Sequence, residues 1–307
     1  SDDVGTGNNT GKGIGITNEL NFTAAGELDN GWSWNYSMEL DPGSTTSTPN
    51  DDTKLTMTTP YGTVGAFVSE GGMDATLKFS PAAYDAGIDV GTGGVLNPID
   101  IGSFNNLQYH TPAGILPLET SIKVGVTAGG SATSEPGDAP LAAGADVSEE
   151  NGSTIQIDTA PIDGLKVGAT YFKVDQSNVL NEAGQEEENG AYYASYKVGS
   201  FGIGYSRALH APALAGTPAT AYNQYDTRSY SAGFVVNDDL SISAGIEKSA
   251  RNLVTDADEF DLKITVVQAA YNMGGMTMTV GVKDIENASY VENADQNEAH
   301  LVLSMAF

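Results

Sequence analysis

The chain ends on the sequence EAHLVLSMAF, which occupies residues 298–307. Leu301, Leu303, Met305 and Phe307 recur at every second position, so they share one face of an extended strand. An exposed apolar edge promotes aggregation in water, which argues against a soluble sheet that simply stops at this strand. The stretch therefore predicts a terminal strand whose apolar face is covered by something other than water.

The same alternation recurs upstream in segments of about ten residues, the length that a tilted strand needs to cross a bilayer. In residues 32–40, the sequence WSWNYSMEL, every second side chain is large and apolar. No run of about 18 apolar residues occurs, which excludes a transmembrane helix. One such strand fits a soluble sandwich as well as a membrane barrel, so the connections have to decide.

Tight turns alternate with long polar loops, the asymmetry that outer-membrane barrels show between their two ends. The pattern predicts fifteen strands, at residues 13–24, 32–40, 53–59, 63–70, 105–111, 118–127, 153–159, 165–175, 191–198, 201–209, 227–236, 240–250, 262–273, 276–288 and 298–307. Single-chain bacterial barrels carry an even number of strands. We therefore expect a sixteenth strand, preceding Ser1, in the intact barrel.

The terminal strand resembles the C-terminal signature of Gram-negative outer-membrane proteins. The order of parts resembles the trimeric, sixteen-stranded general porins, because a hairpin over residues 53–70 precedes the longest connection, Gly71–Ser103. The resemblance implies one transmembrane β-barrel over residues 1–307, with residues 71–103 folded into the pore. It also implies a homotrimer in the bacterial outer membrane, surrounded by lipid and lipopolysaccharide. The assembly machinery would read the signal formed by Leu301, Leu303, Met305 and Phe307.

Composition narrows the function further. The chain has 13 Lys and Arg against 40 Asp and Glu, a net charge of -27, so a nucleic-acid partner is excluded. It has no cysteine, which rules out disulfides and thiolate metal sites. No P-loop, Gly-x-Ser-x-Gly or HExxH motif occurs, so we predict that the protein is not an enzyme.

We therefore expect a porin that forms a water-filled, cation-selective channel for passive diffusion of ions and small hydrophilic solutes. Rings of charge set ion selectivity, and the predicted constriction consists of loop residues Asp74, Lys78, Phe79, Tyr84, Asp85, Asp89 and Asp100 with wall residues Lys54 and Lys123. We expect Asp74, Asp85 and Asp89 to face the two wall lysines. The alternative is that these charges are solvated away from the narrowest point.

Strand parity predicts which other charges face inward, namely Glu19, Glu39, Glu119, Asp158, Lys166, Lys197, Glu247 and Lys283. His110 and His300 fall on the inward parity, whereas His210 is predicted to begin a loop. Hard cations such as Ca²⁺ or Mg²⁺ bind several carboxylate oxygens, which makes candidates of Glu186, Glu187, Glu188, Asp256, Asp258 and Glu259. A solvated acidic loop is the alternative, and no other cofactor is expected.

Two rival functions remain open at this level. A substrate-specific channel would line a path with aromatics such as Phe79 and Tyr84. A secreted β-sandwich adhesin would need neither an even strand count nor the terminal phenylalanine.

Overall fold

The computed structural model describes residues 20–40, 50–68, 70–73, 100–132, 147–178, 187–211, 222–253 and 260–305. In this part of the chain, fifteen antiparallel strands form one sheet in strict sequence order. They are β1 (Leu20–Glu27), β2 (Ser33–Leu40), β3 (Asn50–Thr59), β4 (Gly62–Val68), β5 (Phe104–His110), β6 (Ser121–Ala132), β7 (Val147–Ile162), β8 (Leu165–Asn178), β9 (Glu187–Val198), β10 (Phe201–Ala211), β11 (Tyr222–Val235), β12 (Leu240–Leu253), β13 (Leu262–Asn272), β14 (Met276–Glu286) and β15 (Gln296–Met305). The all-β fold and the fifteen predicted strands are confirmed.

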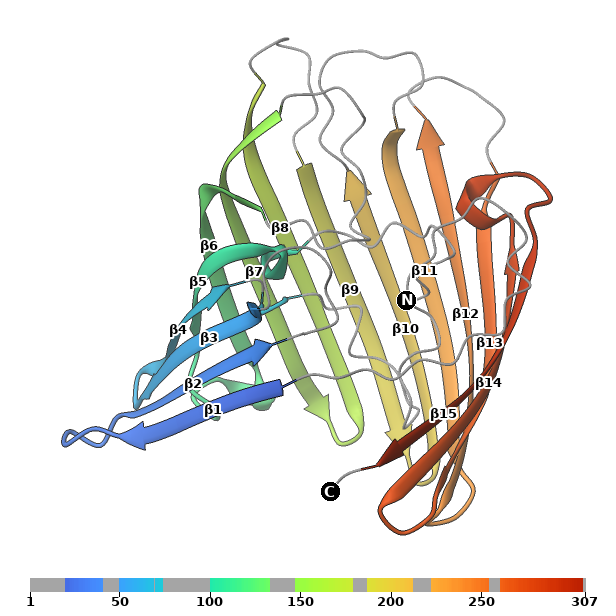
Figure 1. Cartoon of the computed structure of the whole chain (residues 1–307), viewed down its shortest axis with the longest axis horizontal. Helices are drawn as coiled ribbons and strands as arrows, with labels where there is room; N and C mark the ends of the chain where they lie inside the picture. The colour runs from blue at the N-terminus through green and yellow to red at the C-terminus, as the bar shows by residue number, and fades with distance from the viewer. Residues whose placement is uncertain are drawn as a thin grey trace.

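The sheet forms a strongly curved wall, with β1 and β15 at its two edges (Figure 1). Three single-turn 3₁₀ helices interrupt the described connections: η2 (Ile101–Ser103), η3 (Pro117–Glu119) and η4 (Ala288–Tyr290). None of the described helical segments is long and apolar enough to cross a membrane. A sixteenth strand stays a prediction.

Short and long connections alternate along the sheet. Turns such as Gly199-Ser200 and Gly274-Gly275 join strands at one end, the lower end of Figure 1, whereas longer segments such as residues 287–295 join them at the other. Gly274 and Gly275 both have positive φ, 60° and 93°. A two-residue hairpin of that twist needs this conformation at both positions, and glycine adopts it without a steric penalty.

The two faces of the wall have inverted polarity. The inner face buries polar side chains, among them Gln108 (4% exposed) and Gln156 (1%), whereas the outer face exposes Leu107 (57%) and Ile203 (59%). A soluble sandwich buries its apolar face and leaves the polar face in water. Outward apolar and inward polar side chains instead match a barrel with lipid around it and water inside, which removes the adhesin alternative.

Several predicted strand ends differ from the observed ones, and two of the differences have clear local reasons. The strand predicted from residue 118 begins at Ser121, because Leu118 and Glu119 have φ of 58° and 53° and cannot continue a strand. Glu119 therefore lies exposed in η3, outside the strand, so the alternation that predicted an inward side chain does not apply to it. The predicted loop 176–190 is also shorter, since β8 extends to Asn178 and β9 begins at Glu187.

Candidate functional site

The inner wall carries most of the charges that strand parity points inward. Lys54 is the Cα partner of buried Phe67, and Lys123 is the Cα partner of buried Gln156, so both lie on the inner face. By the same pattern of strand pairing and burial, eight further residues predicted to face inward also lie on the inner face: Glu39, Asp158, Lys166, Lys197, Glu247, Lys283, His110 and His300. Glu19 lies outside the described residues.

Two of the inward lysines are already neutralised by a carboxylate. Lys54 forms an ion pair with Glu70, at the start of the long connection after β4. Lys283 on β14 lies 2.7 Å from Glu298 on β15, and its side chain is 2% exposed. The sequence reasoning missed both partners, because residues far apart in the chain meet only after the strands pair.

The ends of the connection 71–103 lie against the inner wall. The two N–H groups of the Asn106 side-chain amide, on β5, are shared among three carbonyl oxygens, those of Glu70, Ile101 and Phe104, at 3.0, 3.0 and 2.8 Å. Gln108, the next inward residue, donates to the Gly71 carbonyl. One strand thus holds both ends of the segment from inside.

An apolar cluster supports these hydrogen bonds. Met73 and Ile101, from the two ends of the connection, are completely buried against Phe104, Phe172 and Val174. Phe172 and Val174 are inward residues of β8, where a polar side chain would ordinarily face water. Their apolar character is explained because the connection covers them.

Asp100 has a structural role in this connection, and its predicted place in the constriction stays a prediction. Its two carboxylate oxygens accept hydrogen bonds from the backbone N–H groups of Met73 (2.7 Å) and Gly102 (2.8 Å). The side chain thereby ties the beginning of the connection to its end. Asp74, Lys78, Phe79, Tyr84, Asp85 and Asp89 lie outside the described residues. Their predicted place in a constriction stays a prediction.

The structure does not bring Glu187 and Glu188 together as predicted cation ligands. Both residues are on β9, where adjacent side chains point to opposite faces, and Glu187 is 2% exposed while Glu188 is exposed. No group of three or more His, Asp or Glu that could hold a metal ion occurs in the described ranges. Glu186, Asp256, Asp258 and Glu259 lie outside them, so a cation site there stays a prediction.

His210 is also placed differently from the prediction. It lies on β10, not in a loop, and is 2% exposed on the inner face. Its Nε2 is 3.6 Å from Oε1 of Glu187, and its ring packs on Tyr225 at a centroid distance of 5.8 Å. The longer β10 brings this histidine into the upper inner wall.

The outer wall carries a feature that the sequence analysis missed. The rings of Tyr192, Tyr205 and Tyr230 pack against one another in tilted pairs across β9–β11, with centroid distances of 6.2 and 5.1 Å. Directly beyond them, Arg207 makes two hydrogen bonds to Asp226, at 2.9 and 2.8 Å, and Arg228 makes a third at 2.7 Å. The sequence does contain a signal for this cluster. Arg207 follows Tyr205 by two residues, so the charge lies on the same outward face of the strand as the aromatic side chain.

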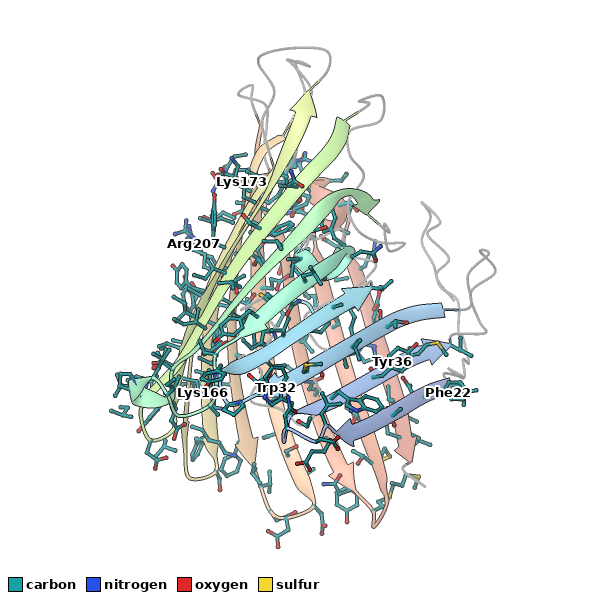
Figure 2. All side chains as sticks on the ribbon, turned by 90° about the vertical axis from the view of Figure 1, so that its left-hand side faces the viewer. Phe22, Trp32, Tyr36, Lys166, Lys173 and Arg207 are labelled. Atoms are coloured by element: carbon teal, nitrogen blue, oxygen red, sulfur yellow. The ribbon has the colours of Figure 1, made fainter. Side chains whose placement is uncertain are left out.

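Further cations extend this outer cluster. Lys248 is the Cα partner of Arg228, and Lys263 is the Cα partner of Lys248. Figure 2 shows Lys173 and Arg207 toward one end of the wall, with Lys166 toward the other end. We call Lys173, Arg207, Arg228, Lys248 and Lys263 the outer basic cluster.

The chain matches the family model described as Gram-negative porin over residues 1–307. No curated protein matches its sequence. Three similar solved structures are a porin refined at 1.8 Å (16% identity, TM-score 0.62, 94% of this chain and 92% of that one), Salmonella typhi OmpF with daunomycin (13%, 0.66, 93% and 88%) and a trimer form of Vibrio cholerae OmpT (13%, 0.58, 93% and 87%). At these identities the structures establish the fold alone. The wall has apolar side chains outside and polar side chains inside, and the family model matches the whole length of the chain. This chain therefore belongs to the Gram-negative porin family and forms a channel for passive diffusion across the bacterial outer membrane.

Proposed function

We propose that this porin passes cations in preference to anions, together with small hydrophilic solutes. The observation that carries the proposal is charge balance. The described strands point basic residues inward, but these are matched by inward carboxylates, namely Glu39, Asp52, Asp158, Glu187, Glu247 and Glu298. The chain as a whole is at -27, so the remaining surplus is negative. With the described wall near balance, the carboxylates of the predicted constriction would set the sign of the interior, and a negative interior attracts cations.

The size of the effect follows from Coulomb's law in water. A carboxylate about 8 Å from the ion path contributes roughly 0.5 kcal/mol, reduced to about 0.2 kcal/mol by physiological salt. Attraction of a cation and repulsion of an anion together give about 0.4 kcal/mol, which is roughly a two-fold preference for each such carboxylate.

The first test replaces the three predicted loop carboxylates, in the triple variant Asp74→Asn, Asp85→Asn and Asp89→Asn. In planar bilayers with a KCl gradient, the unmodified channel should give a reversal potential of the sign for K⁺ preference. The ratio of cation to anion permeability should be several-fold lower in the triple variant, because each carboxylate contributes a factor of roughly two. Asp238→Asn, in an exposed turn after β11, is the control and should change nothing. Anion preference in the unmodified channel would refute the proposal.

We also propose that the protein is a homotrimer in contact with lipopolysaccharide. The trimer form of Vibrio cholerae OmpT supports the first part. The outer basic cluster supports the second, because it begins where the outward apolar residues of β8 and β10–β13 end. Two guanidiniums there share a single carboxylate, Asp226, and Lys263 pairs with Glu286. Lys248 adds a further cation beside Arg228, so the surface keeps a positive balance there. Lipid phosphates are the anions that this level of a membrane offers.

The lipid proposal predicts that the double variant Arg228→Ala, Lys248→Ala binds phosphorylated lipid A vesicles about ten-fold more weakly, since each cation near an anionic surface contributes to binding. Flotation of the purified trimer with such vesicles, at two salt concentrations, measures this. Lys166→Ala is the control, because it removes a cation from the inner face at the opposite end of the wall. Equal loss in the control variant would contradict a defined site.

The assembly signal is a proposal as well. Leu301 (63% exposed) and Leu303 (55%) face outward on β15, as the barrel-assembly machinery would require. The Met305 side chain and Phe307 lie outside the described residues. We propose no catalytic role, in keeping with a family of channels. No observation favours a substrate-specific channel.

A further inference from the structure

The connection between β14 and β15 folds onto the inner wall. Tyr290, in η4, is 4% exposed, and its hydroxyl lies 2.6 Å from the Ser249 hydroxyl on β12. Ser249 is completely buried and shares the inward parity of Glu247 and Ser243. The tyrosine ring also packs on the ring of Tyr225 from β11, at 5.6 Å between centroids. Both contacts are on the inside of the wall.

The reach of this connection is large. Neighbouring strands are about 4.8 Å apart, so β12 lies two spacings from β14, about 10 Å, and β11 three spacings, about 14 Å. Tyr290 contacts both, although its segment leaves the sheet at Glu286. The segment therefore folds inward along the wall, over β13 and β12 as far as β11, and does not stand above its own hairpin.

The wall beneath is adapted to being covered. Leu262, Ile264 and Ile285 are inward residues with at most 1% exposure, and they form one apolar cluster with Ala288 and Tyr290. The Arg251 guanidinium lies 5.2 Å from the centre of the Tyr290 ring. Inward aliphatic side chains in a water-filled channel would cost free energy unless a loop packed on them.

The segment is fixed by its own hydrogen bonds and is strained. Asn287 donates from its backbone N–H to Asp295 (3.1 Å) and from its side chain to the Asp261 carbonyl (3.0 Å), and its side-chain oxygen accepts from Asn293 N–H (3.0 Å). Asn287, Ser289, Tyr290 and Asn293 all have φ between 55° and 59°. Such conformations are costly for residues other than glycine and persist where surrounding contacts impose them, often at functional positions.

We propose that residues 287–295 form a second, fixed constriction at the mouth of the channel, and that Tyr290 is the positioning residue that holds it against β11 and β12. This constriction is separate from the connection 71–103. Its exposed residues Val291, Glu292 and Asn293 bring a carboxylate to the mouth. The inference rests on the channel function and not on its cation preference.

The test combines conductance with cysteine labelling, because the chain has no cysteine of its own. Tyr290→Ala should raise the single-channel conductance by roughly a third or more, since the mouth widens when the segment is released. Tyr290→Phe keeps the ring contacts and should stay near the unmodified value. Tyr61→Ala, in an exposed turn, is the control for loss of a tyrosine elsewhere.

The labelling arm places Ser249→Cys under the segment. With Tyr290 present, this thiol should react at least about ten-fold more slowly with a membrane-impermeant methanethiosulfonate than in the Tyr290→Ala background, because labelling requires local opening. Equal reaction rates in the two backgrounds, or equal conductance of folded Tyr290→Ala channels, would overturn the proposal. If Tyr290→Ala does not fold, the single variant Ser249→Cys still tests the proposal. Rapid labelling of its thiol would overturn the proposal, and slow labelling would support it. Absence of any current from the unmodified protein would instead refute the channel function.

Discussion

Val282→Arg is expected to lower the free energy of unfolding by about 2–4 kcal/mol, because it places a guanidinium on the lipid-facing side of β14. Val282 is 55% exposed on the outer face. Its Cα partners on the neighbouring strands, Val267 and Ala299, are apolar too. The new charge would therefore have lipid around it and no partner of opposite sign beside it on these two strands. Urea unfolding of the protein in lipid vesicles, followed by tryptophan fluorescence, measures the change.

The matched control is one residue away on the same strand. Lys283→Arg keeps a cation on the inner face, where Glu298 lies 2.7 Å from the native amine. A guanidinium there can form the same ion pair with Glu298, so stability should change little. If both variants lose stability equally, the assignment of the two faces of β14 would be wrong.

Asn106→Asp is expected to release the ends of the connection 71–103 from the inner wall. The substitution keeps the size of the side chain but replaces the amide donor with an acceptor. Three carbonyls would lose their hydrogen bond and face a carboxylate, at a cost of about 1–3 kcal/mol or more. Cleavage between residues 74 and 99 by an added protease should accelerate, and the open-channel current should become noisier. Both readouts report the segment directly.

Asn30→Asp is the control for this variant, because it makes the same chemical change in the exposed turn between β1 and β2. The Asn30 side-chain oxygen accepts a hydrogen bond from the Trp32 N–H, and an aspartate can accept the same bond. The charge added there does not meet the carbonyls of Glu70, Ile101 and Phe104. Unchanged proteolysis and current noise in Asn106→Asp would show that the amide does not hold the segment.

The strand pattern and the faces could be predicted because they are local properties. Side chains of a strand alternate between faces at every residue, so the order of apolar and polar residues encodes both the strand and its orientation. Lys123, Glu247 and Lys283 lie on the inner face for this reason. Prediction failed where local backbone geometry interrupts the period, as at Glu119, or where a strand extends past its periodic part, as at Glu187 and His210.

The candidate site was predicted in composition but not in its contacts. The sequence pointed to Lys54 and Asp100 as constriction residues, and only the folded chain brings Glu70 to Lys54 and the Met73 N–H to Asp100. The outer basic cluster has the same origin, since Arg207 and Asp226 meet only when β10 and β11 pair. Pairings between residues on different strands depend on sheet register, which the alternation alone does not specify.

The sequence by itself, in residues 298–307 and in the alternation upstream of them, determined that this protein is an antiparallel sheet with an apolar outer face. It could do so because the two-residue period of a strand is a property of neighbouring residues. Only the tertiary structure decided what occupies the inside. Whether a loop stands in solvent or lies in the lumen, as Tyr290 does on Ser249 and Tyr225, depends on packing between distant segments. That packing balances buried apolar area against backbone strain, and no local pattern in residues 287–295 records the balance.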